Sequence, residues 1–175
     1  MELVGLRLRQ RDGVTCGPTV AAVAGALVDP DRRAALTEPA WFAAEQARVH
    51  AEINRIWPRR LGATPCGMSR ALTEASLPSG VRCRWRFFRG HRDTLADVLR
   101  VVAAGWPVPM LVGGLIPRHW VLIVATDGRR LACYEPTSGD VRTVGIDSVR
   151  HARLAGLGFR RPIALVVPVF ERMIE

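Results

Sequence analysis

The sequence predicts an α+β fold, with helices in its first part and a mostly antiparallel sheet in its second. Apolar residues recur mainly at helical spacing as far as residue 104, and after Gly105 the pattern changes to short β-rich runs separated by Gly, Pro and Asp. Helices followed by strands are typical of α+β domains and do not fit a regular βαβ alternation. The length of 175 residues fits one domain, which we place over 1–175.

The first two predicted helices differ in how much of their surface is apolar. The segment 16–27 is apolar on nearly every side, so we expect a short helix inside the domain, with Pro18 in its first turn. Over 39–57 apolar residues repeat at helical spacing on one face only, which indicates a surface helix. Its solvent-facing residues would be Glu45, Arg48, His50, Glu52 and Arg55.

A helix and a strand are predicted in the next stretch of the chain. Thr64 has the position of an N-cap and Pro65 that of a first helical residue, and the short helix that they open carries Met68 and Leu72 inward. The segment 82–89 alternates arginines with Cys, Trp and Phe, which indicates a half-buried strand with an arginine face.

Another helix is predicted over 94–104, where an apolar stripe recurs at helical spacing. Thr94 and Asp97 stand three residues apart, as in a capping box, so we expect Thr94 to cap the first turn. Gly105 follows the last residue of the stripe and should end the helix, because glycine readily adopts the left-handed conformation of a helix C-terminus.

Five strands are predicted after this helix, and they should form the mostly antiparallel sheet. Between the second and the third strand stands Asp127-Gly128, a strong signal for a hairpin turn. The five strands cover 108–112, 120–125, 130–134, 141–144 and 163–169.

The charge is strongly positive, because 25 basic residues, all of them arginine, stand against 16 acidic ones and give +9. The abundance of Ala, Arg, Gly, Val and Pro indicates a compositional origin, and the alternative is attraction of an anionic partner. Because the arginines are scattered, we do not expect nucleic acid to be that partner. A peptide or protein substrate, acidic if the charge has a role, fits better. Nothing in the sequence indicates an oligomeric state.

Targeting and metal-binding signals are missing from the sequence. It has no secretory signal and no apolar run near the ~20 residues of a membrane span, so we expect a cytoplasmic protein without membrane contact, with non-classical export left open. The four cysteines, which form neither a CxxC pair nor a zinc-site spacing, predict no metal, cofactor or disulfide framework. They are Cys16, Cys66, Cys83 and Cys133.

The start of the first helix is the best candidate for a reactive thiol. Cys16 stands where unpaired N–H groups and the positive end of the helix dipole lower a thiol pKa, and a thiolate is the nucleophilic form. Gly13 and Gly17 allow a tight turn and close approach of a substrate. Attack on an acyl carbon creates an oxyanion, for which we expect the Cys16 N–H and the Gln10 amide as donors.

A thiol nucleophile needs a base and a group that orients the base. His119 is the best base, because it begins an apolar strand after a glycine-rich segment. Glu135 ends the next strand and is the candidate acceptor. If Asp127 and Gly128 form the hairpin turn, His119 and Glu135 lie eight residues before and after Asp127, which predicts that they face one another at the open end of the hairpin.

These residues occur in an order that resembles the papain-like cysteine peptidases, most closely the bacteriocin-processing, double-glycine leader peptidases and their stand-alone relatives. The shared features are a Gln separated by five residues from Cys-Gly at a buried helix, a Gly-x-Pro-Val strand at 105–108, a His before an apolar strand, and an acid-Pro pair with Gly soon after at 135–139. The resemblance covers roughly residues 8–145.

The resemblance implies a papain-like fold and a cysteine-dependent hydrolase of peptide or amide bonds. Cys16 would be the nucleophile, His119 the base, Glu135 the orienting group and Gln10 the oxyanion donor. The family usually has Asp or Asn where this chain has Glu135, so Asp140 is the alternative. Two other functions remain open: a glutamine deamidase or transglutaminase-like acyl transferase, and a papain-like module that binds a peptide without cleaving it.

Overall fold

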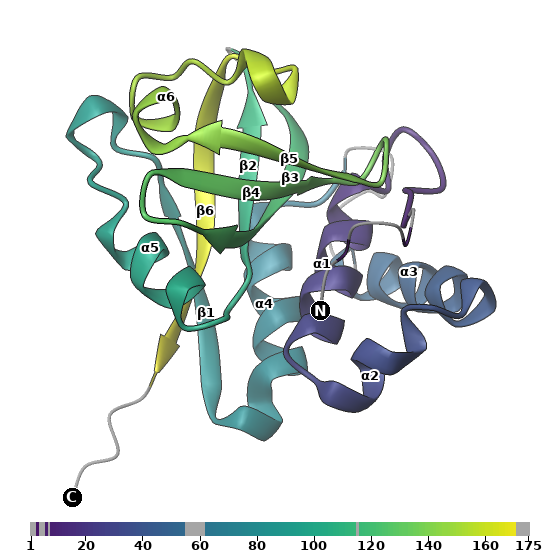
Figure 1. Cartoon of the computed structure of the whole chain (residues 1–175). Coiled ribbons are helices and arrows are strands. Elements are labelled where there is room, and N and C mark those ends of the chain that lie inside the picture. The colour runs from purple at the N-terminus through teal and green to yellow at the C-terminus, as the bar shows by residue number, and fades with distance from the viewer. Residues whose placement is uncertain (1–2, 4–5, 7, 55–61, 115, 171–175) are drawn as a thin grey trace, which may run out of the picture.

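The computed structural model describes residues 3, 6, 8–54, 62–114 and 116–170. A six-stranded sheet, antiparallel between every pair of neighbours, divides two groups of helices (Figure 1). The predicted α+β architecture is confirmed. One face of the sheet packs on α1 (Cys16–Leu27) and α4 (Pro65–Ser76), and the other on α5 (Ala96–Ala103) and α6 (Ile146–Arg150). Helices α2 (Pro30–Ala35) and α3 (Pro39–Ile53) pack on α1.

The strand order in the sheet differs from the order in the chain, and runs β1-β6-β2-β3-β4-β5. The strand predicted at 82–89 is therefore an edge strand of the same sheet, paired with the last strand. The strands are β1 (Val81–Phe87), β2 (Val108–Gly113), β3 (Pro117–Thr126), β4 (Arg130–Glu135), β5 (Asp140–Gly145) and β6 (Arg161–Phe170).

Helix α1 is buried along almost its whole length, as its composition predicts. Every residue from Cys16 to Ala26 is buried, because α3 and α4 cover one side of the helix and β3 covers another. Helix α4 begins as predicted, with the Thr64 hydroxyl accepting a hydrogen bond from the Gly67 N–H at 3.1 Å. The starts of these two helices line one cleft with His119 of β3.

The prediction of a fully solvated face on α3 is wrong at two positions. Glu45 is buried and ion-paired with Arg48, one turn further along, and with Arg32 of α2. His50 is also buried, against the expectation that it is solvated. A buried carboxylate needs such partners, and Arg32 comes from another helix. Helix α3 ends at Ile53. The last residues of the predicted helix, 55–57, lie outside the described part of the chain.

Helix α5 begins two residues later than predicted and without the expected cap. Leu95 precedes it in the left-handed conformation, with φ of 55°, and no side chain caps the helix. The buried carboxylate of Asp93 instead accepts the Leu95 N–H at 3.0 Å. Asp93 is itself held by Arg86 at 2.6 Å, which places one arginine of β1 in a structural ion pair.

The hairpin between β3 and β4 forms at the predicted turn, but its register differs from the expected one. The Asp127 carboxylate accepts the N–H groups of the two residues after Gly128, at 2.8 and 2.6 Å. The turn closes between Asp127 and Arg130, whose backbone N–H and carbonyl lie 3.3 Å apart, and is not centred on Asp127, so that Leu122 lies opposite Tyr134. Glu135 therefore falls beside Val121, and His119 lies two residues further along the same face rather than directly opposite.

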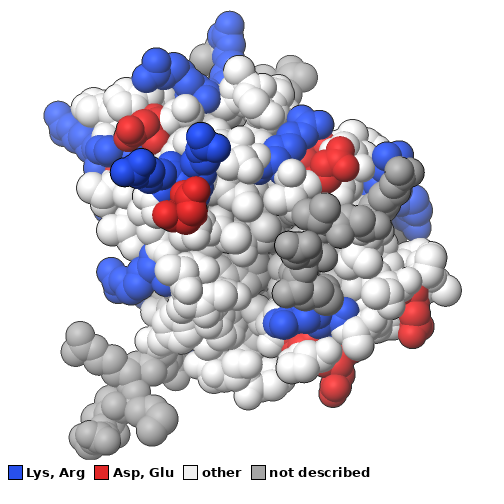
Figure 2. All heavy atoms as spheres, in the orientation of Figure 1, with Lys and Arg blue, Asp and Glu red and all other residues white. Residues whose placement is uncertain are grey.

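The arginines do not form one continuous patch on the face shown in Figure 2, where blue side chains stand apart and acidic ones lie between several of them. This distribution agrees with the scattered arginines of the sequence. Within the described ranges, no helix is long and apolar enough to cross a membrane.

Candidate functional site

The first turn of α1 presents a thiol and two backbone donors. Cys16 is the first residue of the helix and only 5% exposed. The hydroxyl of Thr15, the residue before it, hydrogen-bonds to Asp12 and does not cap the helix. Among the described residues, the N–H groups of Cys16 and Gly17 have no hydrogen-bond partner, and Pro18 has no N–H. Both N–H groups are therefore available to an anion at the Cys16 sulfur.

Gly17 is required by the close packing around this helix start. A Cβ at this position would stand 2.3 Å from the Cβ of Ala63 and 3.2 Å from the Trp120 ring. The Trp120 indole N–H donates to the Ala63 carbonyl at 2.9 Å, which holds the segment before α4 against β3. The glycine after Cys16 thus lets the starts of α1 and α4 approach one another.

His119 and Glu135 form a buried hydrogen-bonded pair. The His119 Nε2 lies 2.7 Å from Glu135 Oε1, and the carboxylate also accepts the backbone N–H groups of Thr137 at 2.8 Å and Ser138 at 3.0 Å. Arg142 of β5 lies 4.0 Å from Glu135 Oε2. Burial raises the pKa of Glu135, but these bonds outweigh it and hold that pKa well below its ordinary value.

His119 also interacts with Cys16, and the two residues line the same cleft. Burial lowers the pKa of His119, but hydrogen bonds to Cys16 and Glu135 and the charges of both raise it to about 9. The ring also stacks on Phe159, with centroids 5.0 Å apart and planes 15° from parallel. His119 is thereby held between a thiol and a carboxylate and covered by an aromatic ring.

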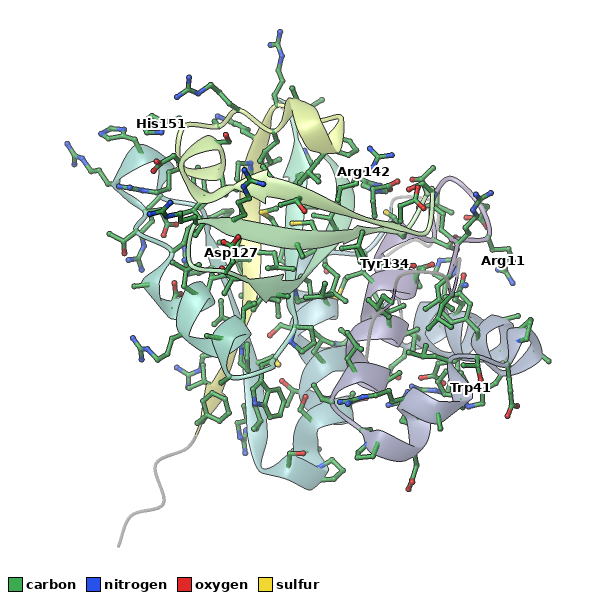
Figure 3. All side chains as sticks on the ribbon, viewed as in Figure 1. Arg11, Trp41, Asp127, Tyr134, Arg142 and His151 are labelled. Carbon is green, nitrogen blue, oxygen red and sulfur yellow. The ribbon has the colours of Figure 1, made fainter. Side chains whose placement is uncertain are left out.

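The chain segment before Cys16 is tied to the turn after β4. Tyr134, labelled in Figure 3 where β4 passes the start of the chain, points its hydroxyl toward this segment. The ties are Tyr134 hydroxyl to Leu8 carbonyl, Gln10 N–H to Pro136 carbonyl at 2.8 Å, and Arg9 Nε to Ser138 carbonyl at 2.8 Å. They hold the approach to Cys16 beside the turn that follows Glu135.

Gln10 and Asp140 are less closely placed than the other candidates. The Gln10 amide nitrogen donates to the Asp12 carbonyl at 2.8 Å, and its oxygen lies 3.5 Å from the Thr137 hydroxyl. An amide nitrogen has a second hydrogen, but Gln10 does not line the cleft described below. Asp140 is exposed, and of the two acids it is Glu135 that contacts His119.

The remaining cysteines lie in three different environments. Burial raises the pKa of the Cys133 thiol to about 12. Burial also raises that of Cys83, to about 11, against a hydrogen bond with Ser76 that lowers it. Neither thiol is reactive near neutral pH. Cys66 is exposed at the start of α4.

A cleft of about 460 Å³ opens where the starts of α1 and α4 face β1, β3 and β6. No Asp, Glu or Arg of the described residues lines it, and its wall is mostly apolar. Its lining includes Cys16, His119, Cys66, Trp85, Phe87 and Ile163. The candidate thiol and base therefore share one apolar cleft.

Sequence reasoning missed three residues that contact the candidate groups or form the cleft wall. Phe159 lies in the loop before β6 and Arg142 lies in β5, and no sequence spacing relates either residue to His119 or Glu135. The third, Phe87, stands in the strand at 82–89, where aromatic residues alternate with arginines. That alternation gave a signal, because apolar residues left opposite an arginine face must pack on something or line a cleft.

Comparison with solved structures finds similar folds. The peptidase domain of Streptococcus ComA, a bi-functional ABC transporter involved in a quorum sensing pathway, matches with a TM-score of 0.51 and 16% identity, over 93% of this chain and 97% of that one. A double glycine motif protease from an AMS/PCAT transporter, in complex with the leader peptide, gives 0.48 and 12%, over 92% and 89%. The Pseudomonas avirulence protein AvrPphB gives 0.46 and 13%, over 97% and 100%.

No protein-family model matches the sequence, and no curated protein is significantly similar to it. The likeness to the ComA peptidase domain shows the fold. The chain has the papain-like cysteine-peptidase fold, as the order of its motifs predicts.

Proposed function

We propose that the chain is a cysteine-dependent hydrolase that cleaves a peptide or amide bond through a thioester on Cys16, with His119 as base and Glu135 as its orienting group. The observation that carries this proposal is the position of His119 between the other two, with its Nε2 2.7 Å from Glu135. Since Nε2 faces the carboxylate, Nδ1 is the nitrogen left for the Cys16 sulfur.

The electrostatics of the pair support a thiolate nucleophile. The pKa of His119 is raised to about 9, against the burial that lowers it, so the imidazole holds its proton at neutral pH. An imidazolium beside a thiol, at a helix start with unpaired N–H groups, stabilises the thiolate. The ionised carboxylate of Glu135 in turn stabilises the imidazolium.

In the first half of the reaction the Cys16 thiolate attacks the carbonyl carbon of the scissile bond. The resulting oxyanion accepts a hydrogen bond from the Cys16 N–H, and a second one from the Gln10 amide when the Gln10 side chain turns toward the cleft. His119 gives its proton to the leaving nitrogen, the C–N bond breaks, and the acyl group remains on Cys16 as a thioester.

In the second half a water molecule attacks the thioester carbon while His119 takes its proton. The C–S bond then breaks, the acid product leaves, and the thiolate and imidazolium are restored. A peptide substrate is supported by the fold, because the solved ComA domain that shares it is a peptidase domain.

Site-resolved alkylation tests the nucleophile. We expect iodoacetamide at pH 7 to label Cys16 about tenfold faster than Cys66 or more, although Cys66 is exposed and Cys16 is 5% exposed. The His119→Ala variant should lose this preference, while the His151→Ala variant, which removes an exposed histidine, keeps it. Equal labelling of Cys16 and Cys66 in the native protein would contradict the proposal.

The products distinguish hydrolysis from the alternative functions. The protein incubated with a proteome-derived peptide mixture should generate new peptide N-termini that are lost in Cys16→Ser. Release of ammonia without new N-termini would instead identify a deamidase or transglutaminase. Neither product, with the peptides retained on the protein, would identify a binding module.

A further inference from the structure

A second hollow of the surface lies on the face of the sheet that carries α5. It is a groove of about 420 Å³ with β6 as its floor, where Val167, Val169 and Phe170 line it. Arg84 of β1 stands on one side of this floor and Arg100 of α5 on the other. Helix α5 packs on β2, β3 and β6. The groove is therefore a part of this sheet face that the helix leaves uncovered.

Large apolar side chains are exposed along the groove. Among the described residues six large apolar side chains are exposed, and half of them, Trp85, Val169 and Phe170, line it, with exposed fractions of 37%, 38% and 48%. The Phe170 ring makes a T-shaped contact with Trp106, with centroids 5.5 Å apart. Exposed apolar side chains that gather at one place indicate an interaction site, whereas single scattered ones do not. The floor of the groove therefore offers apolar surface to a partner.

The arginines of the groove differ in their partners. Arg86 is held by two carboxylates, those of Asp93 and Asp97, each at 2.6 Å. Arg84 and Arg100 are exposed, and within the described ranges neither guanidinium has an ion pair or a hydrogen bond. Of the described residues that line the groove, Asp97 is the one acid, and it already binds Arg86. Two guanidinium groups are thus free to bind anions, one on each side of an apolar floor.

We propose that this groove binds an acidic segment of a partner protein, whose carboxylates pair with Arg84 and Arg100 and whose bulky apolar side chain packs on Val169 and Phe170. Charge complementarity selects this occupant, because a carboxylate is the protein group that a guanidinium binds with two parallel hydrogen bonds. Two copies of the chain joined groove to groove would bring like charges together. A nucleic acid would pair its phosphates with the arginines and leave the apolar floor unused.

The groove is distinct from the cleft that holds the candidate thiol. Successive side chains of a strand point to opposite faces of the sheet, so Arg84 and Arg86 of β1 line the groove, Phe87 lines the cleft, and Trp85 lines both. Neither Cys16 nor His119 lines the groove. Binding there requires no reactive thiol, and the inference does not depend on the proposed function.

Selection from a random peptide library displayed on phage tests the chemistry of the partner. The immobilised protein carries Cys16→Ser, so that no bound peptide is lost to cleavage. We expect the enriched peptides to contain Asp or Glu on both sides of a Leu, Phe or Trp. The same protein with Arg84→Glu and Arg100→Glu should not enrich them. Enrichment of peptides without acidic residues, equal enrichment on both proteins, or no enrichment on either would overturn the inference.

Fluorescence anisotropy with one labelled, enriched peptide locates the binding. Arg84→Gln and Arg100→Gln should each weaken binding about five- to tenfold, because each removes one guanidinium–carboxylate pair. Val169→Thr keeps the shape of the side chain and adds a hydroxyl, and should weaken binding about threefold. Arg153→Gln, which removes an exposed arginine outside the groove, should leave the affinity unchanged. Losses in the groove variants no larger than in Arg153→Gln would contradict the proposed surface.

Two further measurements address the other occupants. Sedimentation of the native protein reports self-association, and anisotropy with a labelled single-stranded RNA reports nucleic-acid binding. We expect neither to depend on the groove. Self-association or RNA binding that Arg84→Glu with Arg100→Glu abolishes would assign the groove to a second copy or to a nucleic acid, and would overturn the inference. The iodoacetamide test of Cys16 is independent of all these results, so a failure of the proposed function and a failure of this inference are distinguished.

Discussion

The starts of α1 and α4 are two versions of the same local arrangement, and they line the same cleft. Each has a threonine at the N-cap position and a Cys-Gly pair in its first turn. At both glycines a Cβ would overlap a neighbour, at 2.3 Å for Gly17 and 2.8 Å for Gly67. They differ in burial and in partners: Cys66 is exposed, whereas Cys16 is buried and contacts His119.

The difference shows that a position at a helix start does not by itself make a thiol nucleophilic, because free backbone donors and a neighbouring imidazole are also needed. In α4 the threonine hydroxyl occupies one N–H of the first turn, whereas in α1 the threonine faces Asp12 and leaves the donors free. The imidazole comes from β3, about a hundred residues from Cys16 in the chain. A search for Cys-Gly at helix starts would select both cysteines, and the proposed base, His119, distinguishes Cys16 from Cys66.

Replacement of each cysteine should give the largest difference between the two helix starts, measured as a loss of peptide cleavage. We expect Cys16→Ser to lower peptide cleavage by at least about 10⁴-fold, because a hydroxyl beside His119 is a far weaker nucleophile, and Cys66→Ser to keep most of the native rate. The measurement is kcat/KM on a substrate found by peptide profiling. Comparable losses in both variants would mean that the two helix starts share the chemistry.

The role of Glu135 should be visible in the pH profile. Since His119 titrates at about 9, cleavage should fall as pH rises through that value, when the proton for the leaving group is lost. In Glu135→Gln this alkaline limb should move roughly one pH unit or more toward neutral, because the charge that raises the His119 pKa is gone. A limb that stays in place would assign the third role to another group, such as Asp140.

The same titration affects stability, with a defined sign. The pKa of His119 is raised from 6.5 to about 9 on folding, so its contribution to the free energy of unfolding is complete below about pH 6.5 and is lost as pH rises through about 9. Urea unfolding across this range should show the loss in the native protein and not in His119→Ala.

Replacement of Gly17 or Gly67 by alanine should give the smallest effects, and the two variants should lose similar amounts of stability. Gly17→Ala and Gly67→Ala should each lower the free energy of unfolding by roughly 1–3 kcal/mol, because the added methyl meets Ala63 in one case and the Ile53 carbonyl in the other. Thermal or urea unfolding measures both. A neutral Gly17→Ala would show that residues 62–64 can move away from α1.

Much of the fold can be predicted from the sequence where local pattern decides it. The strands, the buried α1 and the Asp127 turn follow from periodicity and turn residues. One error lies where a distant element decides: Glu45 is buried because Arg32 of another helix pairs with it. The other lies in the β3–β4 turn, which closes between Asp127 and Arg130 and is not centred on Asp127.

The candidate site was predictable to the extent that it follows strand ends and helix starts. Cys16, His119 and Glu135 could be proposed from the order of motifs, and the structure brings them together. The diagonal placement of His119 and Glu135 also suits the longer side chain of Glu where Asp or Asn would be usual. Phe159 and the position of β1 beside β6 depend on chain crossovers that spacing does not encode.

The ties between residues 8–10 and the turn after β4 also set a time order. Leu8 and Gln10 form hydrogen bonds with a part of the chain that is synthesised about 125 residues later. The surroundings of Cys16 are therefore incomplete until these two segments have met. A growing or half-folded chain carries the thiol without its imidazole. Under the proposed function, the reactivity of Cys16 is therefore a property of the folded chain, and an incomplete copy could not cleave its neighbours.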